Sequence, residues 1–163
     1  MNTKLILDFK QSAKSSEWTI TDDIVMGGKS NSQFYVSPAK HGVFQGKVSL
    51  ENNGGFSSVR YREQKFIIKK HKNIIIHLCG DGKKYQFRVK SKIEDQHSYI
   101  FYFETSGEWE EIIIPLKELV PRFRGKTLDM PNFSGNAIEE IGFIIGNERE
   151  EDFKLYIDSI ELK

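Results

Sequence analysis

The sequence contains little of what builds disulfide-rich, helical or membrane-spanning proteins. Its single cysteine, Cys79, excludes an intrachain disulfide, and its place at the end of an apolar run is typical of a small core residue. The first apolar stretch, residues 5–7, is far too short for a signal peptide or a membrane span. We therefore expect a cytoplasmic protein without direct membrane insertion. Alanine, the best helix former, occurs only at Ala13, Ala39 and Ala137.

The chain also lacks an excess of charge of either sign. Its 24 lysines and arginines balance 23 aspartates and glutamates, which gives a formal net charge of +1. Proteins that bind nucleic acid through a general electrostatic field carry a much larger positive charge. The charge balance thus predicts no nucleic-acid partner.

Aromatic and β-branched residues are abundant, and they alternate with polar ones. Tyr85, Phe87 and Val89 are separated by Gln86 and Arg88, the period-two pattern of a strand with one wet face. The same reasoning predicts strands at residues 4–9, 18–21, 33–37, 43–50, 56–62, 73–78, 85–89, 98–104, 109–114, 141–145 and 153–162. Helix is confined to single turns at residues 115–119 and 136–140. We expect one all-β domain over residues 1–163, a β-sandwich or jelly roll of two antiparallel sheets.

Three local patterns refine this sandwich. Asp81-Gly82 is a strong hairpin signal and predicts that strands 73–78 and 85–89 are antiparallel neighbours. The first and last strands are strongly apolar, and we expect them to pair or lie close together. The alternation in the last strand changes phase, which predicts a bulge near Asp158-Ser159.

The stretch TDDIVMGGKS, residues 21–30, ends in letters typical of a nucleotide-binding loop. A P-loop needs a glycine five positions before Gly28, where this chain has Asp23, and a helix after Ser30, where a strand-like segment follows. The pattern favours a glycine-rich turn in which Asp22 or Asp23 accepts hydrogen bonds from loop amides or pairs with Arg60.

Metal and catalytic sites have weak support in the sequence. The histidines show no zinc-ligand spacing. Asp8 and Asp158, in the first and last strands, are weak candidates for a structural calcium site, although such carboxylates also serve to fix turns. No nucleophile elbow or complete dinucleotide fingerprint is present, and nothing singles out a carboxylate pair. We expect no catalytic residues and no required cofactor.

Two arginine-bearing segments are the best binding candidates. In NNGGFSSVR, a tight turn at Asn53-Gly54 leads into a strand on which Arg60 shares a face with Phe56. Arg60 is therefore either half-buried beside an acid, with Asp22, Asp23 or Asp81 as candidates, or it lines a groove. The second segment, RFRGKTLDMPNF (residues 122–133), combines arginines, an amide and aromatics in what reads as an irregular loop, which either binds a polar ligand or serves as a packed crossover. The candidate binding residues are Asp22, Asp23, Asn53, Arg60, Arg88, Tyr102, Arg122, Arg124 and Asn132.

The segments TDDIVMGGKS, NNGGFSSVR, GDGKKYQFRVK, FRGKTLDMPNFSG and IGFIIGNEREEDFKLYIDSIEL together resemble the complex I intermediate-associated protein 30 family. This resemblance implies a galactose-binding-like jelly roll, the architecture of many carbohydrate-binding modules. It also implies a non-enzymatic role, because family members assist assembly of the membrane arm of NADH:ubiquinone oxidoreductase in mitochondria.

Three functional hypotheses follow. The first is a binding module that holds a protein partner, such as a respiratory-complex subunit or assembly intermediate, through rim loops and a polar sheet face. Arginines supply the donors there, and Tyr102 is a candidate aromatic platform, although burial in the core is the fate we expect for that tyrosine. The second is a carbohydrate-binding module, which requires aromatics arrayed on an exposed sheet face. The third is an enzyme, which would need a pocket holding two close carboxylates with strongly shifted pKa values.

Overall fold

The computed structural model describes residues 4–11, 15–22 and 28–163, and antiparallel strands dominate it. Single turns of 3-10 helix lie at η1 (Ser15–Glu17), η3 (Glu51–Asn53) and η4 (Leu116–Glu118). The strands are β1 (Lys4–Asp8), β2 (Trp18–Asp22), β3 (Asn31–Val36), β4 (Gly42–Val48), β5 (Ser57–Tyr61), β6 (Phe66–Ile67), β7 (Asn73–Cys79), β8 (Lys84–Lys90), β9 (Ser98–Glu104), β10 (Trp109–Pro115), β11 (Val120–Phe123), β12 (Lys126–Thr127), β13 (Ala137–Ile138), β14 (Glu140–Ile145) and β15 (Glu151–Leu162). None of the helices in the described residues is long and apolar enough to cross a membrane.

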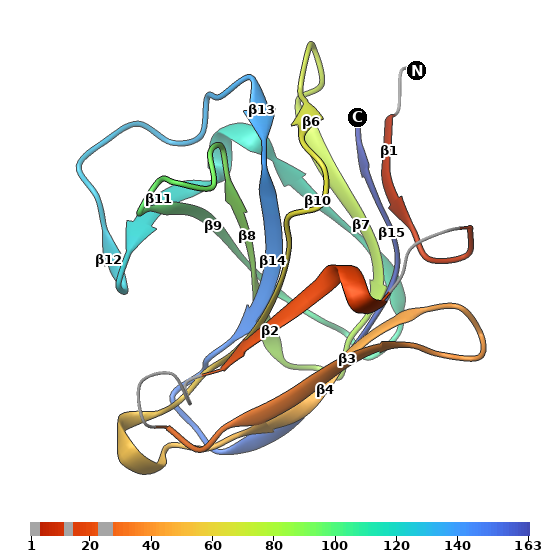
Figure 1. Cartoon of the computed structure of the whole chain (residues 1–163), viewed down its shortest axis with the longest axis vertical. Helices are drawn as coiled ribbons and strands as arrows, with labels where there is room; N and C mark the ends of the chain where they lie inside the picture. The colour runs from red at the N-terminus through yellow and green to blue at the C-terminus, as the bar shows by residue number, and fades with distance from the viewer. Residues whose placement is uncertain (1–3, 12–14, 23–27) are drawn as a thin grey trace.

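Two large sheets make up the sandwich (Figure 1). The seven-stranded sheet has the order β12–β11–β9–β8–β14–β5–β2, and the six-stranded sheet has the order β10–β7–β15–β4–β3 with β1 also paired to β15. A small separate sheet joins β13 to β6. The predicted all-β sandwich of antiparallel sheets is confirmed.

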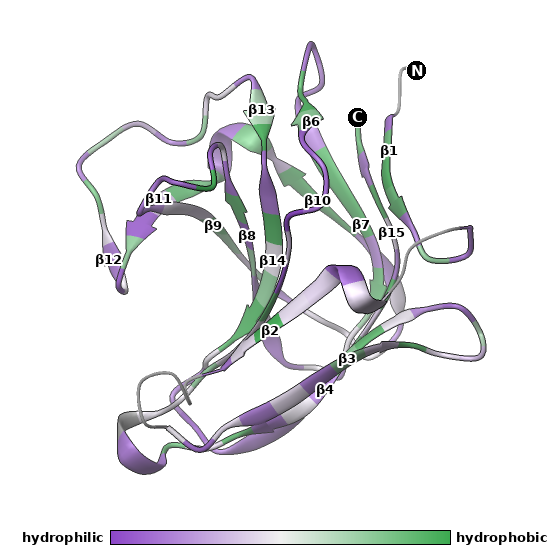
Figure 2. Ribbon diagram, in the orientation of Figure 1, coloured by the Kyte–Doolittle hydropathy of each residue, from purple (hydrophilic) through white to green (hydrophobic). Residues whose placement is uncertain are grey.

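Hydrophobic and hydrophilic residues alternate along several strands (Figure 2), and the buried ones form a core rich in aromatic side chains between the sheets. Trp18 of β2 stacks on Phe34 of β3 with ring centroids 4.8 Å apart, and Tyr85 of β8 meets Phe153 of β15 at 6.4 Å. Each pair joins one sheet to the other. A fully buried side chain of this size stabilises the fold by roughly 1.5–3 kcal/mol relative to an exposed one.

The expected pairing of the two ends of the chain is confirmed. Strand β1 runs antiparallel to β15, with Lys4 opposite Leu162 and Asp8 opposite Ser159. The register between β15 and β7 shifts between Ile157 and Ser159, at the predicted bulge. The bulge lets both halves of β15 direct apolar side chains into the core.

The hairpin predicted at Asp81-Gly82 is wrong. Strand β7 pairs with β10 and β15, whereas β8 pairs with β9 and β14, so residues 80–83 carry the chain from one sheet to the other. Asp81 braces this crossover, because its carboxylate accepts hydrogen bonds from the Tyr85 hydroxyl at 3.0 Å and from the Lys154 amide at 2.8 Å. Burial and the Asp81 charge raise the pKa of Tyr85, so its hydroxyl stays protonated and donates.

Two further segments differ from expectation. Residues 136–140 are not a helical turn, because β13 lies there and β14 begins at Glu140. The segment from Arg122 to Phe133 is not wholly irregular, because β11 and β12 form a hairpin at the edge of the seven-stranded sheet. The single turn expected within residues 115–119 is present as η4.

Candidate binding groove

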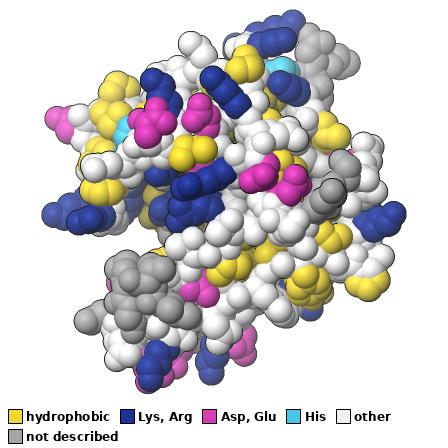
Figure 3. All heavy atoms as spheres, in the orientation of Figure 1, with side chains coloured by type: hydrophobic (Ala, Val, Ile, Leu, Met, Phe, Trp, Pro, Cys, Tyr) yellow, Lys and Arg dark blue, Asp and Glu magenta, His cyan; other side chains and the backbone are white. Residues whose placement is uncertain are grey.

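A groove of about 790 Å³ lies on the outer face of the seven-stranded sheet. Among the described residues, five cationic side chains line it, and Glu140 is the one acidic residue that does. Figure 3 shows lysine and arginine side chains gathered near the middle of this view of the molecule. The cations of the groove are Arg60, Arg88, Lys90, Arg122 and Arg124.

Strand register brings two of these arginines into one row. Gly142 of β14 pairs with Arg60 of β5 on one side and with Arg88 of β8 on the other. A Cβ atom at position 142 would lie 2.6 Å from the carbonyl oxygen of Val59 and 3.4 Å from the Cβ of Arg60. Only glycine fits here without a shift of the backbone, and Gly142 itself lines the groove between the two arginines.

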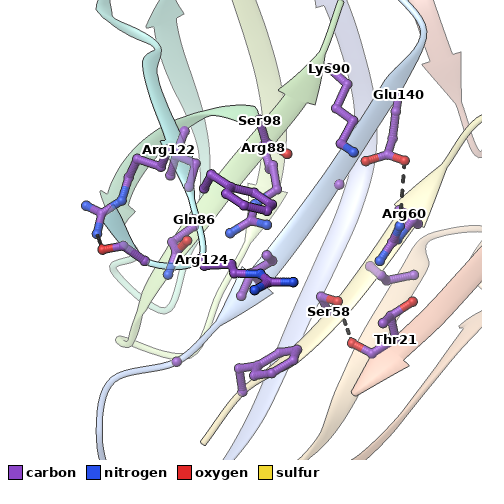
Figure 4. A pocket seen from close by; sticks show the side chains of 18 of the residues that line it. Thr21, Ser58, Arg60, Gln86, Arg88, Lys90, Ser98, Arg122, Arg124 and Glu140 are labelled. Carbon is purple, nitrogen blue, oxygen red and sulfur yellow. Dashed lines mark hydrogen bonds and ion pairs between the residues drawn. The ribbon is translucent and has the colours of Figure 1, made fainter. Parts of the chain in front are cut away.

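A third arginine reaches this part of the groove from the β11–β12 turn. The turn residues Arg124 and Gly125 both have positive φ, 51° and 77°, and they are flanked by the paired residues Phe123 and Lys126. This is the backbone of a two-residue hairpin turn that favours Asn-Gly, so an arginine at its first position is unusual. Figure 4 shows Arg124 extended over the sheet toward Arg88 and Arg60.

Glu140 is the acid partner of Arg60. Its side chain is buried, and its Oε1 atom lies 2.5 Å from Nε of Arg62 and 3.9 Å from Nη1 of Arg60. The expected partners were aspartates. Instead, the described Asp22 accepts a hydrogen bond from the Ser32 hydroxyl at 2.7 Å, and Asp81 braces the sheet crossover. Arg60 is paired with an acid and also lines the groove. Both alternatives that the sequence offered for this residue are therefore true at once.

Arg88 is the most desolvated cation of the groove. Burial lowers the pKa of Arg88, and the positive charge of Arg60 lowers it further, yet a guanidinium stays protonated at every physiological pH. Its Nε atom is buried and has no hydrogen-bond partner among the described residues. Glu140, the groove's acid, already contacts Arg62 and Arg60. A buried cation with an unused donor is costly, and such costs are commonly retained where a ligand compensates them.

Tyr102 lies on the groove face and not in the core. Its side chain is 42% exposed, so burial, the fate expected for this residue, is wrong. Two cations sit over the ring: Nζ of Lys84 is 4.9 Å from the ring centroid and the guanidinium carbon of Arg122 is 5.8 Å from it. Arg122 itself is turned outward and donates to the carbonyl of Gly125 (Figure 4).

The remaining candidate residues lie elsewhere or are not described. Asp22 is buried near the end of β2 and does not line the groove. Asn132 donates to the Lys117 carbonyl at 3.0 Å, which ties its loop to η4. Asp23 lies outside the described residues, as do Met26 and Gly27 of the expected rigid turn. Asn53 belongs to η3, and its side chain is not described.

Sequence reasoning thus identified four arginines of the groove but missed Glu140, Gly142 and Lys90. Lys90 carried a usable signal, because it has the same strand parity as Arg88 on β8. Glu140 carried none, because its strand contains no arginine and meets the arginines only through strand pairing. Burial lowers the pKa of Lys90, and its ammonium donates to the Asp95 carbonyl at 2.7 Å. Gly142 carried none, because its importance depends on which strands flank β14.

Asp8 and Asp158, the weak candidates for a calcium site, interact with protein groups that carry N–H donors. Asp8 accepts a hydrogen bond from the Lys10 amide at 2.9 Å. Asp158 lies 3.0 Å from Nδ1 of His77 and 3.4 Å from Nζ of Lys10. Within the described part of the chain, no three histidine, cysteine, aspartate or glutamate side chains gather closely enough to hold a metal ion. A calcium ion at Asp8 and Asp158 stays an untested prediction.

Asp158 gives the fold a pH dependence. Burial raises the pKa of Asp158, but hydrogen bonds from His77 and Lys10 outweigh this effect, so the pKa lies below its ordinary value. A carboxylate of this kind stabilises the fold above its unfolded pKa of about 4, and that contribution is lost as the pH falls through the lower folded pKa. We therefore expect Asp158→Asn to lose less stability than the wild type when urea unfolding is compared at pH 6 and pH 3. Equal losses in the two proteins would show that Asp158 does not contribute.

Comparison with known proteins decides the family. The model of the family "Complex I intermediate-associated protein 30 (CIA30)" matches residues 7–157. The chain belongs to this family. Its CIA30 relative in Drosophila melanogaster, named "Complex I intermediate-associated protein 30, mitochondrial", is 23% identical over 186 aligned residues. The alignment covers 99% of this chain and 63% of the fly protein, so this CIA30 chain spans less than two-thirds of that relative's length.

Solved structures similar to this CIA30 chain include carbohydrate-binding modules. The family 11 module of the cellulase Lic26A-Cel5E of Clostridium thermocellum superposes with a TM-score of 0.75 at 16% identity, covering 99% of this chain and 94% of the module. The family 11 module from Clostridium thermocellum in complex with a β-1,3-1,4-mixed-linked tetrasaccharide gives a TM-score of 0.73 at 17% identity, with 98% and 94% covered. At such identity the likeness establishes the fold alone. It confirms the expected galactose-binding-like jelly roll.

Proposed function

We propose that this CIA30 chain is a non-catalytic module of complex I assembly. It holds a respiratory-complex subunit or an assembly intermediate against the outer face of the seven-stranded sheet and the loops at its rim. Membership of the CIA30 family supports an assembly role. The groove supports binding more than chemistry, because it offers many cationic donors and one acid that is already paired.

One observation carries the choice of surface: a row of arginines on a sheet face that is left without enough acids to neutralise it. On the solvent-facing side of a sandwich sheet, polar side chains alternate with residues that point into the core. Here Arg60, Arg88 and Arg124 converge from two strands and one turn (Figure 4). The sequence predicts a cytoplasmic location. Wherever the protein is located, this sheet face must be accessible to the partner.

Affinity capture from native cells tests the proposal. The chain carries a tag, and the captured proteins are identified by mass spectrometry against a mock capture. We expect enrichment of subunits of NADH:ubiquinone oxidoreductase or of its assembly intermediates. If no such subunit is enriched, the client assignment is wrong, whatever else the chain binds.

A second candidate function is carbohydrate binding, which the similarity to the family 11 modules favours. Sugar rings stack on bare aromatic faces, and Tyr102 is the exposed tyrosine of the groove. The cations of Lys84 and Arg122 over its ring oppose this use. A glycan array that includes mixed-linked β-glucan oligosaccharides tests it: binding that is lost in Tyr102→Ala would establish carbohydrate binding, and an array without signal would reject it.

A further inference from the structure

We propose that the groove binds acidic side chains of an extended segment of the partner protein, with Arg60, Arg88 and Arg124 around Gly142 as the central carboxylate site. This inference rests on the proposed function and names the chemistry by which the partner is recognised. It identifies the occupant as polypeptide, and not as phosphate, nucleic acid or a neutral sugar.

The charge of the groove requires an anion. Five cations line it against Glu140 alone among the described residues, although the whole chain carries a net charge of only +1. Glu140 forms its ion pairs with Arg62 and Arg60. Among the described residues, Nε of Arg88 has no hydrogen-bond partner. The guanidinium carbon of Arg124 lies 5.1 Å from the centroid of the Phe123 ring, a contact that leaves its N–H donors available for a carboxylate. A carboxylate fits because guanidinium groups bind it through two parallel hydrogen bonds.

The groove beside Gly142 gives the anion a place to bind. Arg60 and Arg88 are two strands apart, roughly 10 Å between backbones, with only the glycine between them. Arg124 closes the third side from the β11–β12 turn, as Figure 4 shows.

Two of these arginines make the free protein less stable. Arg88 holds a buried Nε donor without a partner among the described residues, and Arg124 occupies a left-handed backbone conformation that side chains larger than asparagine disfavour. Both features make sense if a bound carboxylate compensates for them. A structural role would predict the opposite, namely that replacing either arginine destabilises the fold.

The rest of the lining favours a polypeptide. Apolar and aromatic side chains lie among the cations, and inorganic phosphate has no apolar group that could contact them. From β2 to β9 the groove spans four strand spacings, roughly 19 Å, which suits an extended segment of about six residues. The apolar and aromatic residues of the lining are Phe56, Val59, Ile100, Tyr102, Phe123 and Ile144.

A pair of short labelled peptides tests the ligand chemistry. One alternates glutamate with leucine over eight residues, and the other carries glutamine in place of glutamate. Fluorescence anisotropy at low salt should show binding of the glutamate peptide, at least tenfold weaker binding of the glutamine peptide, and weakening as salt is raised. Equal binding of both peptides, or no binding of either, would overturn the inference. So would displacement of the glutamate peptide by equimolar inorganic phosphate or single-stranded DNA.

Variants of the two costly arginines separate binding from structure. Arg88→Met and Arg124→Asn should each weaken binding of the glutamate peptide at least tenfold. Both should also raise the melting temperature, by about 2–4 °C for each kcal/mol gained in a chain of this size. Lys47→Gln removes a cation from the exposed face of β4 on the other sheet and should leave the peptide affinity unchanged. Lower melting temperatures for both arginine variants would mean that these residues serve the fold, and the inference would fall.

This inference and the proposed function fail separately. If affinity capture enriches respiratory subunits but the glutamate peptide does not bind, the assembly role stands and the acidic recognition is wrong. If the peptide binds as expected but no such subunit is captured, the groove chemistry stands and the client is a different acidic protein.

Discussion

Replacing Phe87 with alanine is expected to lower the free energy of unfolding by about 3–5 kcal/mol. Phe87 lies on β8 with none of its surface exposed, and its ring meets Phe143 of β14 edge to face with centroids 5.3 Å apart. Truncation removes buried apolar surface and leaves a cavity that the surrounding strands cannot close. Urea unfolding followed by tryptophan fluorescence measures the loss.

Ile113→Ala is the control for this core prediction. Ile113 is an apolar strand residue of β10, but its side chain is 56% exposed, so its truncation should change stability by no more than about 0.5 kcal/mol. Similar losses in Phe87→Ala and Ile113→Ala would mean that the core does not lie between the two sheets. Gln86 and Arg88, which line the groove, flank Phe87 on β8. The loss of stability in Phe87→Ala therefore also measures how much core packing stabilises the strand that carries these two groove residues.

Glu140→Gln is expected to lower the free energy of unfolding by about 2–3 kcal/mol. Breaking a buried ion pair usually costs about 3–5 kcal/mol, and solvent around the partly exposed arginines reduces this figure. Glu140 is only 4% exposed and contacts Arg62 and Arg60. Without its charge, the cations of the groove repel one another with no acid between them.

The size of this loss should depend on salt. Screening weakens repulsion between partly exposed charges, so Glu140→Gln should lose more stability at low salt than at high salt. Urea suits this comparison because, unlike guanidinium chloride, it adds no ions. The same substitution should tighten binding of the glutamate peptide, since it removes the one carboxylate that competes for the arginines.

Glu104→Gln is the matched control for Glu140→Gln. Glu104 lies at the end of β9 on the same outer face, but it is exposed, and its loss should change stability by no more than about 0.5 kcal/mol. If the two variants lose equal stability, or if Glu140→Gln lowers the affinity for the glutamate peptide, the electrostatic account of the groove is wrong.

The sequence was sufficient for most of the long strands, which depend on neighbours along the chain. Period-two alternation located these strands, placed Arg88 on the face opposite Tyr85 and Phe87, and left two alternatives for Arg60 that both hold. The bulge near Ser159 followed from the phase of one strand. In each case the information lay within about ten residues, which is the range over which side-chain alternation is defined.

What the sequence could not supply is the order of the strands. Asp81-Gly82 is typical of a hairpin, but its carboxylate binds Tyr85 and Lys154, and the chain changes sheets there. Glu140 reaches Arg62 across 78 positions of sequence, so local reasoning offered nearby aspartates instead. The short strands β11 and β12 are equally hidden, because two or four residues carry too little alternation to detect.

The most direct test of the central claim is quantitative affinity capture with the double variant Arg60→Gln, Arg88→Gln beside the wild type and Lys47→Gln. If the outer face of the seven-stranded sheet binds the partner, subunits of NADH:ubiquinone oxidoreductase should fall at least tenfold in the double variant and stay at the wild-type level in Lys47→Gln. Circular dichroism should confirm that all three proteins are folded. Equal recovery of these subunits by the folded double variant and the wild type would contradict the account and place the binding surface elsewhere.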